Sequence, residues 1–198
     1  PEVSTLPRAT VEHADANQPD FEPYQRDGEL LARPWAIPGT PGLEHRIGGL
    51  TKAPVTGDVV YDPENHARMV ALRYEKIEGI ARDIPPIEVN GPDRGELLVI
   101  GWGSTHGAIT AALKAVRERG LDVSHAHLRH LNPLPPDLGD LLGRFRRVLL
   151  PELNLGQLSM LLRARYLLDI ESFTKVAGQP FKVAEIQAKI EQMLEGSS

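Results

Sequence analysis

The sequence predicts an α/β fold in which a largely parallel sheet carries helices on both faces. From residue 96 onward, short apolar runs alternate four times with amphipathic segments. This alternation is typical of parallel strands joined by right-handed crossovers. The first run, 97–102, is continuously apolar, as expected for a strand that is buried on both faces of a sheet.

The expected elements follow one another with short connections. We expect strands at 97–102, 121–128, 147–151 and 173–177, and helices at 104–119, 137–142, 156–168 and 183–194. An earlier helix begins after Asp62, which can cap its first free amides, with Pro63 at its first position, and Pro85-Pro86 ends it. Its expected apolar stripe consists of Met69, Leu72, Ile77, Ile80 and Ile84.

Residues 1–62 differ in composition from the rest of the chain, because they are rich in proline, glycine and charged residues and lack apolar periodicity. We expect an extended arm, with disorder as the alternative. The apolar side chains Phe21, Tyr24, Trp35 and Ile37 favour an ordered arm that lies on a larger partner. The chain begins at Pro1 rather than Met, so we expect a processed product or a piece of a longer protein.

Composition excludes several classes of function. The formal net charge of −5 disfavours general binding to a nucleic-acid backbone, which needs surplus Lys and Arg. No apolar run approaches the roughly 20 residues of a membrane span, and no signal-peptide pattern is visible. The chain has no cysteine, which excludes disulfides and thiolate-ligated clusters within it. We therefore expect a cytoplasmic protein that binds neither nucleic acid nor membrane.

The glycine-rich segment 101–107 lies between an expected strand and an expected helix. Its glycines and the free amides at the helix start could cradle a phosphate. However, the spacing differs from the dinucleotide motif, and no acidic residue follows about 20 positions later at a strand end. We favour the simpler interpretation, a tight turn capped by Ser104 or Thr105.

A second polar segment, 151–158, follows the third expected strand. Glu152, Asn154 and Gln157 would lie at the carboxyl edge of the sheet, where ligands of parallel sheets gather. Alternatively, Asn154 caps the next helix while Glu152 stays solvated. Both interpretations remain open.

Two clusters of charged residues complete the candidates. Arg144, Arg146 and Arg147, together with Arg129 and His130, could form a fork of donors for coenzyme A or phosphate. We favour the simpler alternative, a solvated charge run.

The segment 42–49 places Glu44, His45 and Arg46 together between glycines, and a histidine can change protonation near neutral pH. The sequence contains no spacing typical of a metal site and no nucleophile elbow. The residues alone therefore give no complete catalytic constellation.

Several segments, taken in order, resemble one protein family. These are 101–107, 127–135, 152–158 and 175–181. They resemble the C-terminal part of the α subunit of 2-oxoacid:ferredoxin oxidoreductases, most closely the 2-oxoglutarate type. Residues 42–45 and the basic helix 68–76 are similar to the segment that leads into that part. The resemblance covers residues 35–195.

The resemblance implies a thiamine diphosphate enzyme that decarboxylates a 2-oxoacid, reduces ferredoxin and transfers the acyl group to coenzyme A. Residues 91–196 would form a transketolase C-terminal-like domain, and residues 1–90 the end of the pyrimidine-binding domain with its exit. Thiamine diphosphate, Mg²⁺ and a [4Fe-4S] cluster would lie largely on the β subunit, with none bound wholly by this chain. The partners would be the β subunit, the remainder of the α subunit, ferredoxin, coenzyme A and the 2-oxoacid.

The candidate residues fall into two sets. The catalytic candidates are Glu44 and His45, and no metal ligands are expected. The candidates for coenzyme A or phosphate binding are Ser104, Thr105, Arg129, Arg146, Asn154 and Gln157.

Two features depart from the family pattern. Most of the pyrimidine-binding domain, with the residues for the substrate carboxylate, is missing, so this piece should not turn over by itself. Residues 46–49 read Arg-Ile-Gly-Gly where the family more often has an acidic residue, which weakens an active-site role for His45. Two other hypotheses are a non-catalytic assembly module and another transketolase-like enzyme. The ordered set of motifs favours the oxidoreductase over the latter.

Overall fold

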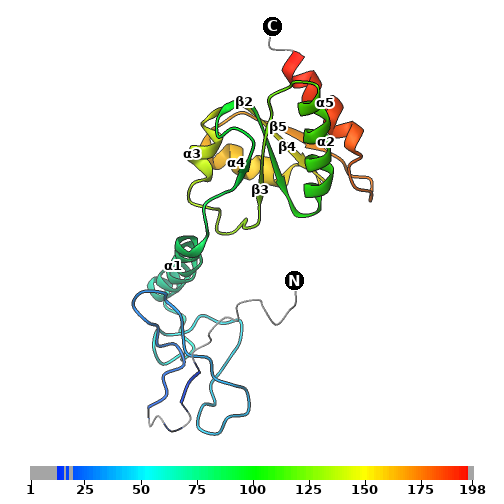
Figure 1. The fold of residues 1–198 in the computed structure, drawn as a ribbon. Coiled ribbons are helices and arrows are strands. Elements are labelled where there is room, and N and C mark those ends of the chain that lie inside the picture. The colour runs from blue at the N-terminus through cyan, green and yellow to red at the C-terminus, as the bar shows by residue number, and fades with distance from the viewer. Residues whose placement is uncertain (1–12, 16, 18–19, 196–198) are drawn as a thin grey trace. The chain divides into compact units, whose positions relative to one another are not determined.

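The computed structural model describes residues 13–15, 17 and 20–195 (Figure 1). The chain divides into two compact units, Pro1–Ile80 and Ala81–Ser198. None of the helices in this described part is long and apolar enough to cross a membrane.

The second unit is built on a five-stranded mixed sheet, which confirms the α/β prediction. Four strands run parallel to one another: β2 (Gly95–Trp102), β3 (Ser124–Leu128), β4 (Phe145–Glu152) and β5 (Ile170–Thr174). The strand order is β1-β3-β2-β4-β5. The sequence did not reveal β1 (Val89–Asn90), which pairs antiparallel with β3 and makes the sheet mixed.

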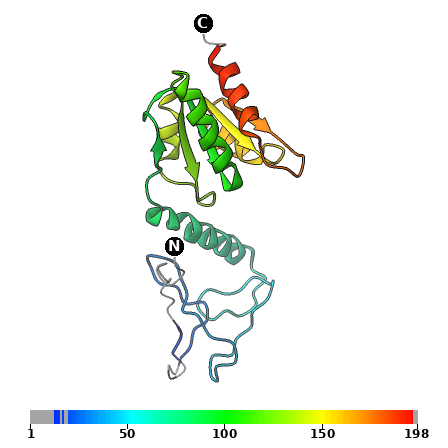
Figure 2. The ribbon, with the colours of Figure 1, turned by 45° about the vertical axis from the view of Figure 1, so that its right-hand side comes forward.

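Helices cover both faces of this sheet (Figure 2). One face carries α2 (His106–Glu118) and α5 (Val183–Glu195), which pack beside each other. The other face carries α3 (Leu138–Leu142) and α4 (Gln157–Tyr166). A single 3₁₀ turn, η3 (Gly103–Thr105), connects β2 to α2.

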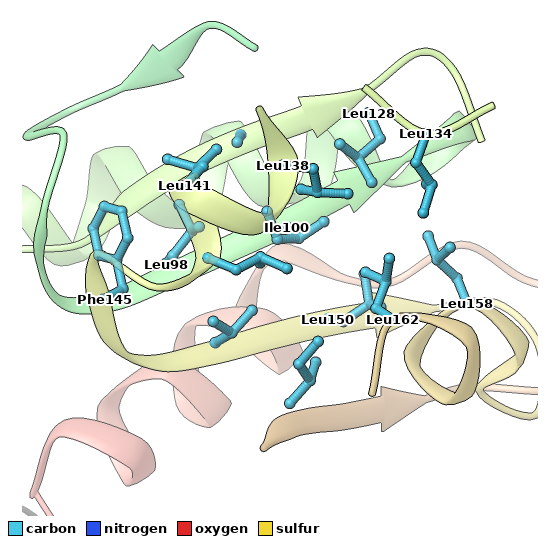
Figure 3. Close-up of a cluster of buried hydrophobic side chains, with 14 residues drawn as sticks. Leu98, Ile100, Leu128, Leu134, Leu138, Leu141, Phe145, Leu150, Leu158 and Leu162 are labelled. Atoms are coloured by element: carbon cyan, nitrogen blue, oxygen red, sulfur yellow. The ribbon is translucent and has the colours of Figure 1, made fainter. Parts of the chain in front are cut away.

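The apolar core has two layers because successive side chains of a strand point to opposite faces. Leu98 and Ile100 of β2 belong to the layer under α3 and α4, whereas Leu97 and Val99 belong to the layer under α2 and α5. All four side chains are buried. Figure 3 shows the first of these layers, in which the side chains of the strands meet those of the two short helices.

The last parallel strand begins three residues earlier than expected. Helix α4 ends at Tyr166, since Leu167 has a left-handed backbone with φ of 54°. The leucines after Tyr166 extend the apolar pattern of the helix, and this hides its end in the sequence. The shortened helix leaves Ile170 to begin β5, where it is buried.

The first unit is mostly irregular. Within its described part before Pro63, the extended pairing consists of single bridges, His13 with Trp35, Tyr24 with Val55 and Lys52 with Val59. The Arg33 guanidinium lies over the Tyr24 ring at 4.1 Å. The described part of this segment is thus joined by isolated bridges and side-chain contacts rather than by regular strands.

Helix α1 (Pro63–Gly79) follows the arm as expected. The side chain of Asp62 accepts a hydrogen bond from the Asn65 amide at 2.9 Å and caps the helix. A 3₁₀ turn, η2 (Ile80–Asp83), continues the chain. Of the expected apolar stripe, only Met69 is buried within α1, whereas Ile77 stays exposed. The apolar stripe of α1 is therefore only partly buried within this unit.

Candidate functional site

The carboxyl ends of the parallel strands lie at one edge of the sheet. Several candidate residues lie on the two loops that follow β2 and β4 at this edge. Strands β2 and β4 are neighbours, yet α2 and α4, which follow them, lie on opposite faces. This is a topological switch point, where open α/β sheets form their ligand crevice. The fold brings the loop with Ser104 and Thr105 and the loop with Asn154 and Gln157 to this edge.

The turn after β2 is held by the hydroxyl of Thr105. This hydroxyl accepts a hydrogen bond from the Trp102 amide at 3.1 Å and donates one to the Trp102 carbonyl at 2.8 Å. Thr105 is buried, with 4% of its surface exposed, whereas Ser104 is exposed. Thr105 therefore shapes the turn, and Ser104 is the hydroxyl that faces solvent.

The amides at the start of α4 are occupied by side chains of the preceding loop. Asn154 Oδ1 accepts from the amides of Gly156 at 2.7 Å and Gln157 at 3.3 Å. The two carboxylate oxygens of Glu152 accept from the amides of Leu158 and Ser159, each at 3.0 Å. Helix N-termini bind anions through free amides, so this N-terminus offers a phosphate no free donor among these four groups.

The expectation that Glu152 stays solvated is wrong, because its exposed fraction is 0%. The carboxylate reaches forward from the end of β4 and becomes part of the helix cap. The expected cap by Asn154 is present beside it. Among the polar side chains of this segment, Gln157 remains exposed at the edge.

The structure separates the arginines that the sequence grouped as one donor fork. Arg129 follows the carboxyl end of β3, which pairs with Trp102 at the end of β2. Arg146 lies near the amino end of β4 and forms an ion pair with Glu96 at 3.4 Å. Trp102 lies six positions after Glu96 along the extended strand, so Arg129 and Arg146 lie about 20 Å apart. They do not share a site.

Three histidines that the sequence did not single out as a site lie together beside β3. His125 and His127 are two residues apart on one strand and therefore share a face. They meet His106, the first residue of α2, and the three ring centroids are 4.7–5.7 Å apart. The His-x-His spacing on an expected strand was the sequence signal that could have indicated this cluster. The proximity of His106 on α2 is apparent only from the fold.

These histidines line a cavity of about 410 Å³ that also includes Thr110, Arg129 and His130. Burial, followed by the charges of His127, His106 and Arg117, lowers the pKa of His125 to about 4. Burial is also the largest cause of the lowered pKa of His127. Both rings are therefore neutral at neutral pH.

Glu44 and His45 lie in the first unit, on the wall of a polar cavity of about 800 Å³. The Glu44 carboxylate accepts a hydrogen bond from the Gly42 amide at 2.8 Å. His45 Nδ1 lies 2.9 Å from the Leu43 carbonyl, and its ring packs edge-on against Phe21 at 5.5 Å. Both side chains are thus engaged with their own loop. Across the described residues, no group of three or more His, Asp or Glu side chains is placed to hold a metal ion.

Known proteins resemble the chain along nearly its whole length, although no protein-family profile matches it. It is 52% identical over 197 residues to the 2-oxoglutarate oxidoreductase subunit KorA of Mycobacterium tuberculosis, covering 99% of this chain. It is 33% identical over 146 residues to the α subunit of 2-oxoacid:ferredoxin oxidoreductase 1 of Aeropyrum pernix, covering 70% of this chain. The solved 2-oxoglutarate:ferredoxin oxidoreductase of Magnetococcus marinus superposes on 92% of this chain with a TM-score of 0.82 and 28% identity.

The chain belongs to the family of 2-oxoacid:ferredoxin oxidoreductase α subunits. It spans only 30% of the Mycobacterium tuberculosis subunit, 22% of the Aeropyrum pernix subunit and 32% of the Magnetococcus marinus chain. The Mycobacterium tuberculosis and Aeropyrum pernix relatives are named as subunits, which implies further subunits in their enzymes. The Magnetococcus marinus structure contains 2-oxoglutarate, coenzyme A and succinyl-CoA.

Proposed function

We propose that this chain is part of the α subunit of a 2-oxoglutarate:ferredoxin oxidoreductase. In the assembled enzyme, 2-oxoglutarate and coenzyme A would yield succinyl-CoA and CO₂, and two electrons would pass to ferredoxin. The single observation that carries this proposal is the 52% identity to KorA over 197 residues. The superposition on the Magnetococcus marinus enzyme supports it independently.

The residues of this chain do not fit the metal-bearing cofactors of such an enzyme. An iron–sulfur cluster needs cysteine thiolates, and the chain has none. Mg²⁺ is usually held by one or two carboxylates together with phosphates, and among the described residues no three His, Asp or Glu side chains are grouped to hold a metal ion. We therefore propose that thiamine diphosphate with Mg²⁺, and the [4Fe-4S] cluster, are held largely by the β subunit.

Within this chain, we propose that exposed donors at the carboxyl edge contact the phosphates of coenzyme A. Ser104, Arg129 and Gln157 are all exposed there. Thr105 and Asn154 would act indirectly, because their side chains already hold the two loops in shape. Arg146 is the weakest of the six candidates, since it lies at the opposite edge. The cytoplasm, where ferredoxin and coenzyme A are available, is the proposed location.

A second role, docking of another part of the enzyme, is favoured by one specific observation. Helix α4 and its flanking loops expose four large apolar side chains to solvent. These are Leu155, Met160, Leu161 and Leu167. Exposed apolar patches of this kind mark interaction surfaces. The two roles are compatible, because docking and coenzyme A binding would use different residues.

The proposed activity is tested on the protein purified with its co-purifying subunits. Ferredoxin reduction should require both 2-oxoglutarate and coenzyme A, and mass spectrometry should identify succinyl-CoA as the product. Pyruvate, offered in place of 2-oxoglutarate, tests the choice of 2-oxoacid. A properly assembled complex that reduces ferredoxin with neither 2-oxoacid would refute the proposal.

A further inference from the structure

The sheet of the second unit has two side edges of different kinds. One is β1, which is only two residues long. The other is β5, which is five residues long and lies outermost, beyond β4, with no further strand beside it among the described residues (Figure 3). Its sequence contains neither the proline nor the lysine with which proteins often protect an exposed edge. Strand β5 is therefore open to pairing with another strand.

The backbone groups that face outward belong to the even-numbered residues of β5. The Lys175 amide, just past the strand, donates to a carbonyl of β4 at 2.9 Å, so the odd-numbered residues direct their backbone groups toward β4. The carbonyl of Ile170 instead accepts a hydrogen bond from the Arg163 side chain at 2.9 Å. Ser172 and Thr174, which are both exposed, therefore direct their amides and carbonyls away from β4.

The flank of α4 above this edge is partly apolar. The hydroxyls of Ser159 on α4 and Ser172 on β5 lie 2.9 Å apart, which places the helix over β5. Arg163 marks the outer flank of the helix, because its side chain reaches an outward carbonyl of β5. Met160 and Leu167 lie three positions before and four positions after Arg163, and therefore on the same flank. Their exposed fractions are 65% and 88%, so apolar side chains accompany the open backbone edge.

We propose that the edge of β5 and this flank of α4 bind the same surface of a second copy of the chain. The two β5 strands would run antiparallel around a two-fold axis at Ser172, so that one sheet continues through both chains. Two-fold contacts of this self-complementary kind are the commonest in homo-oligomers. The inference rests on the docking role proposed above, for which it names the partner, and not on the oxidoreductase activity.

The directions of the backbone groups suit this register. With Ser172 opposite its own copy, Ile170 lies opposite Thr174 of the second copy. All three residues have outward backbone groups, so each pair can exchange the two hydrogen bonds of an antiparallel ladder. This is the only register in which all five residues of β5 face β5 of the second copy.

The charges at the ends of β5 are also complementary in this register. Asp169, which forms an ion pair with Arg163 at 3.1 Å, would lie opposite Lys175 of the second copy. Lys175 pairs with Glu185 of its own chain at 2.8 Å, so the contact would join two ion pairs into a network, the arrangement in which surface charges contribute most. A shift that places Glu171 opposite its own copy would instead oppose like charges, which is destabilising.

The test uses single cysteines, because the chain has none of its own. Ser172→Cys would place two thiols opposite each other, with Cα atoms about 5.5 Å apart, a separation that a disulfide spans. Thr174→Cys is the matched control, since it is exposed on the same edge but would lie about 14 Å from its copy. After mild oxidation of the protein with its co-purifying subunits, mass spectrometry should find a 172–172 disulfide and no 174–174 disulfide.

A second pair of variants tests the pairing without a cross-link. Thr174→Pro removes an outward amide, a change that edge strands tolerate, whereas Thr174→Val keeps this amide at the same position. Sedimentation velocity should show that the proline variant raises the dissociation constant of self-association about tenfold or more, because the two-fold axis removes two hydrogen bonds at once. The valine variant should associate like the wild type.

Several results would overturn the inference. Ser172→Cys could form no disulfide with its own copy, or could link to a different subunit, which would identify another occupant of this surface. Equal cross-linking of Thr174→Cys, or a Thr174→Pro variant that associates like the wild type, would also contradict the proposed register. None of these assays measures turnover, so a failure here is distinguishable from a failure of the proposed oxidoreductase activity.

Discussion

Glu152 offers a sharp test of how this fold joins its sheet to its helices. In Glu152→Ala, the buried amides of Leu158 and Ser159 lose the carboxylate that accepts them at 3.0 Å. Each buried donor left without a partner costs about 1–3 kcal/mol. Removal of the buried charge itself offsets part of this cost. We therefore expect the free energy of unfolding to fall by about 3 kcal/mol.

Urea denaturation followed by circular dichroism measures this change, and amide hydrogen exchange at Leu158 and Ser159 locates it. Glu152→Gln keeps one acceptor oxygen and should lose roughly half as much. Glu171→Ala is the matched control, since Glu171 lies on the neighbouring strand in a partly exposed ion pair with Lys189, and such pairs contribute at most about 1 kcal/mol. If Glu152→Ala loses no more stability than this control, the carboxylate is not what holds the helix start.

Three further predictions concern the histidines beside β3 and the carboxyl edge. The folded chain keeps His125 neutral because its pKa is lowered from 6.5 to about 4. The unfolded chain therefore binds more protons below pH 6.5, and the free energy of unfolding should fall by about 3 kcal/mol as the pH drops to 4. Denaturant titrations between pH 6.5 and 5 should show a flatter pH dependence for His125→Gln, and an unchanged dependence would contradict the assignment. Gly101→Ala should lower the free energy of unfolding by about 1–3 kcal/mol, because the added methyl group would lie 2.7 Å from His127 and Ile109 side-chain atoms. A variant as stable as the wild type would show that these side chains move aside freely. In the assembled enzyme, Arg129→Ala should raise the KM for coenzyme A with kcat unchanged; unchanged kinetics with weaker subunit association would favour the docking role.

Much of the second unit could be predicted from sequence because its signals are local. The run 97–102 is buried on both faces, and the glycine-marked ends of the helices are close to where they were expected. The missed strand β1 is only two residues long and borders the turn at Gly91 and Pro92. Its pairing depends on β3, more than 30 residues later. Periodicity in a short window carries no information about such a partner.

The candidate site was harder to predict because function at a sheet edge depends on which ends of the strands coincide. Parallel strands place all their carboxyl ends together, so a residue after β3 and a residue at the start of β4 lie at opposite edges. This rule alone separates Arg129 from Arg146, although only 17 positions separate them in the sequence. The chain direction at each residue was as informative as its chemistry.

The start of α4 lies at this carboxyl edge but is poorly suited to an anion. Glu152 brings a negative charge to the start of α4 and, with Asn154, occupies its first amides. An incoming phosphate would meet a carboxylate there instead of free donors. A helix N-terminus at the carboxyl edge is therefore not by itself an anion site, because side chains of the preceding loop can already occupy its amides.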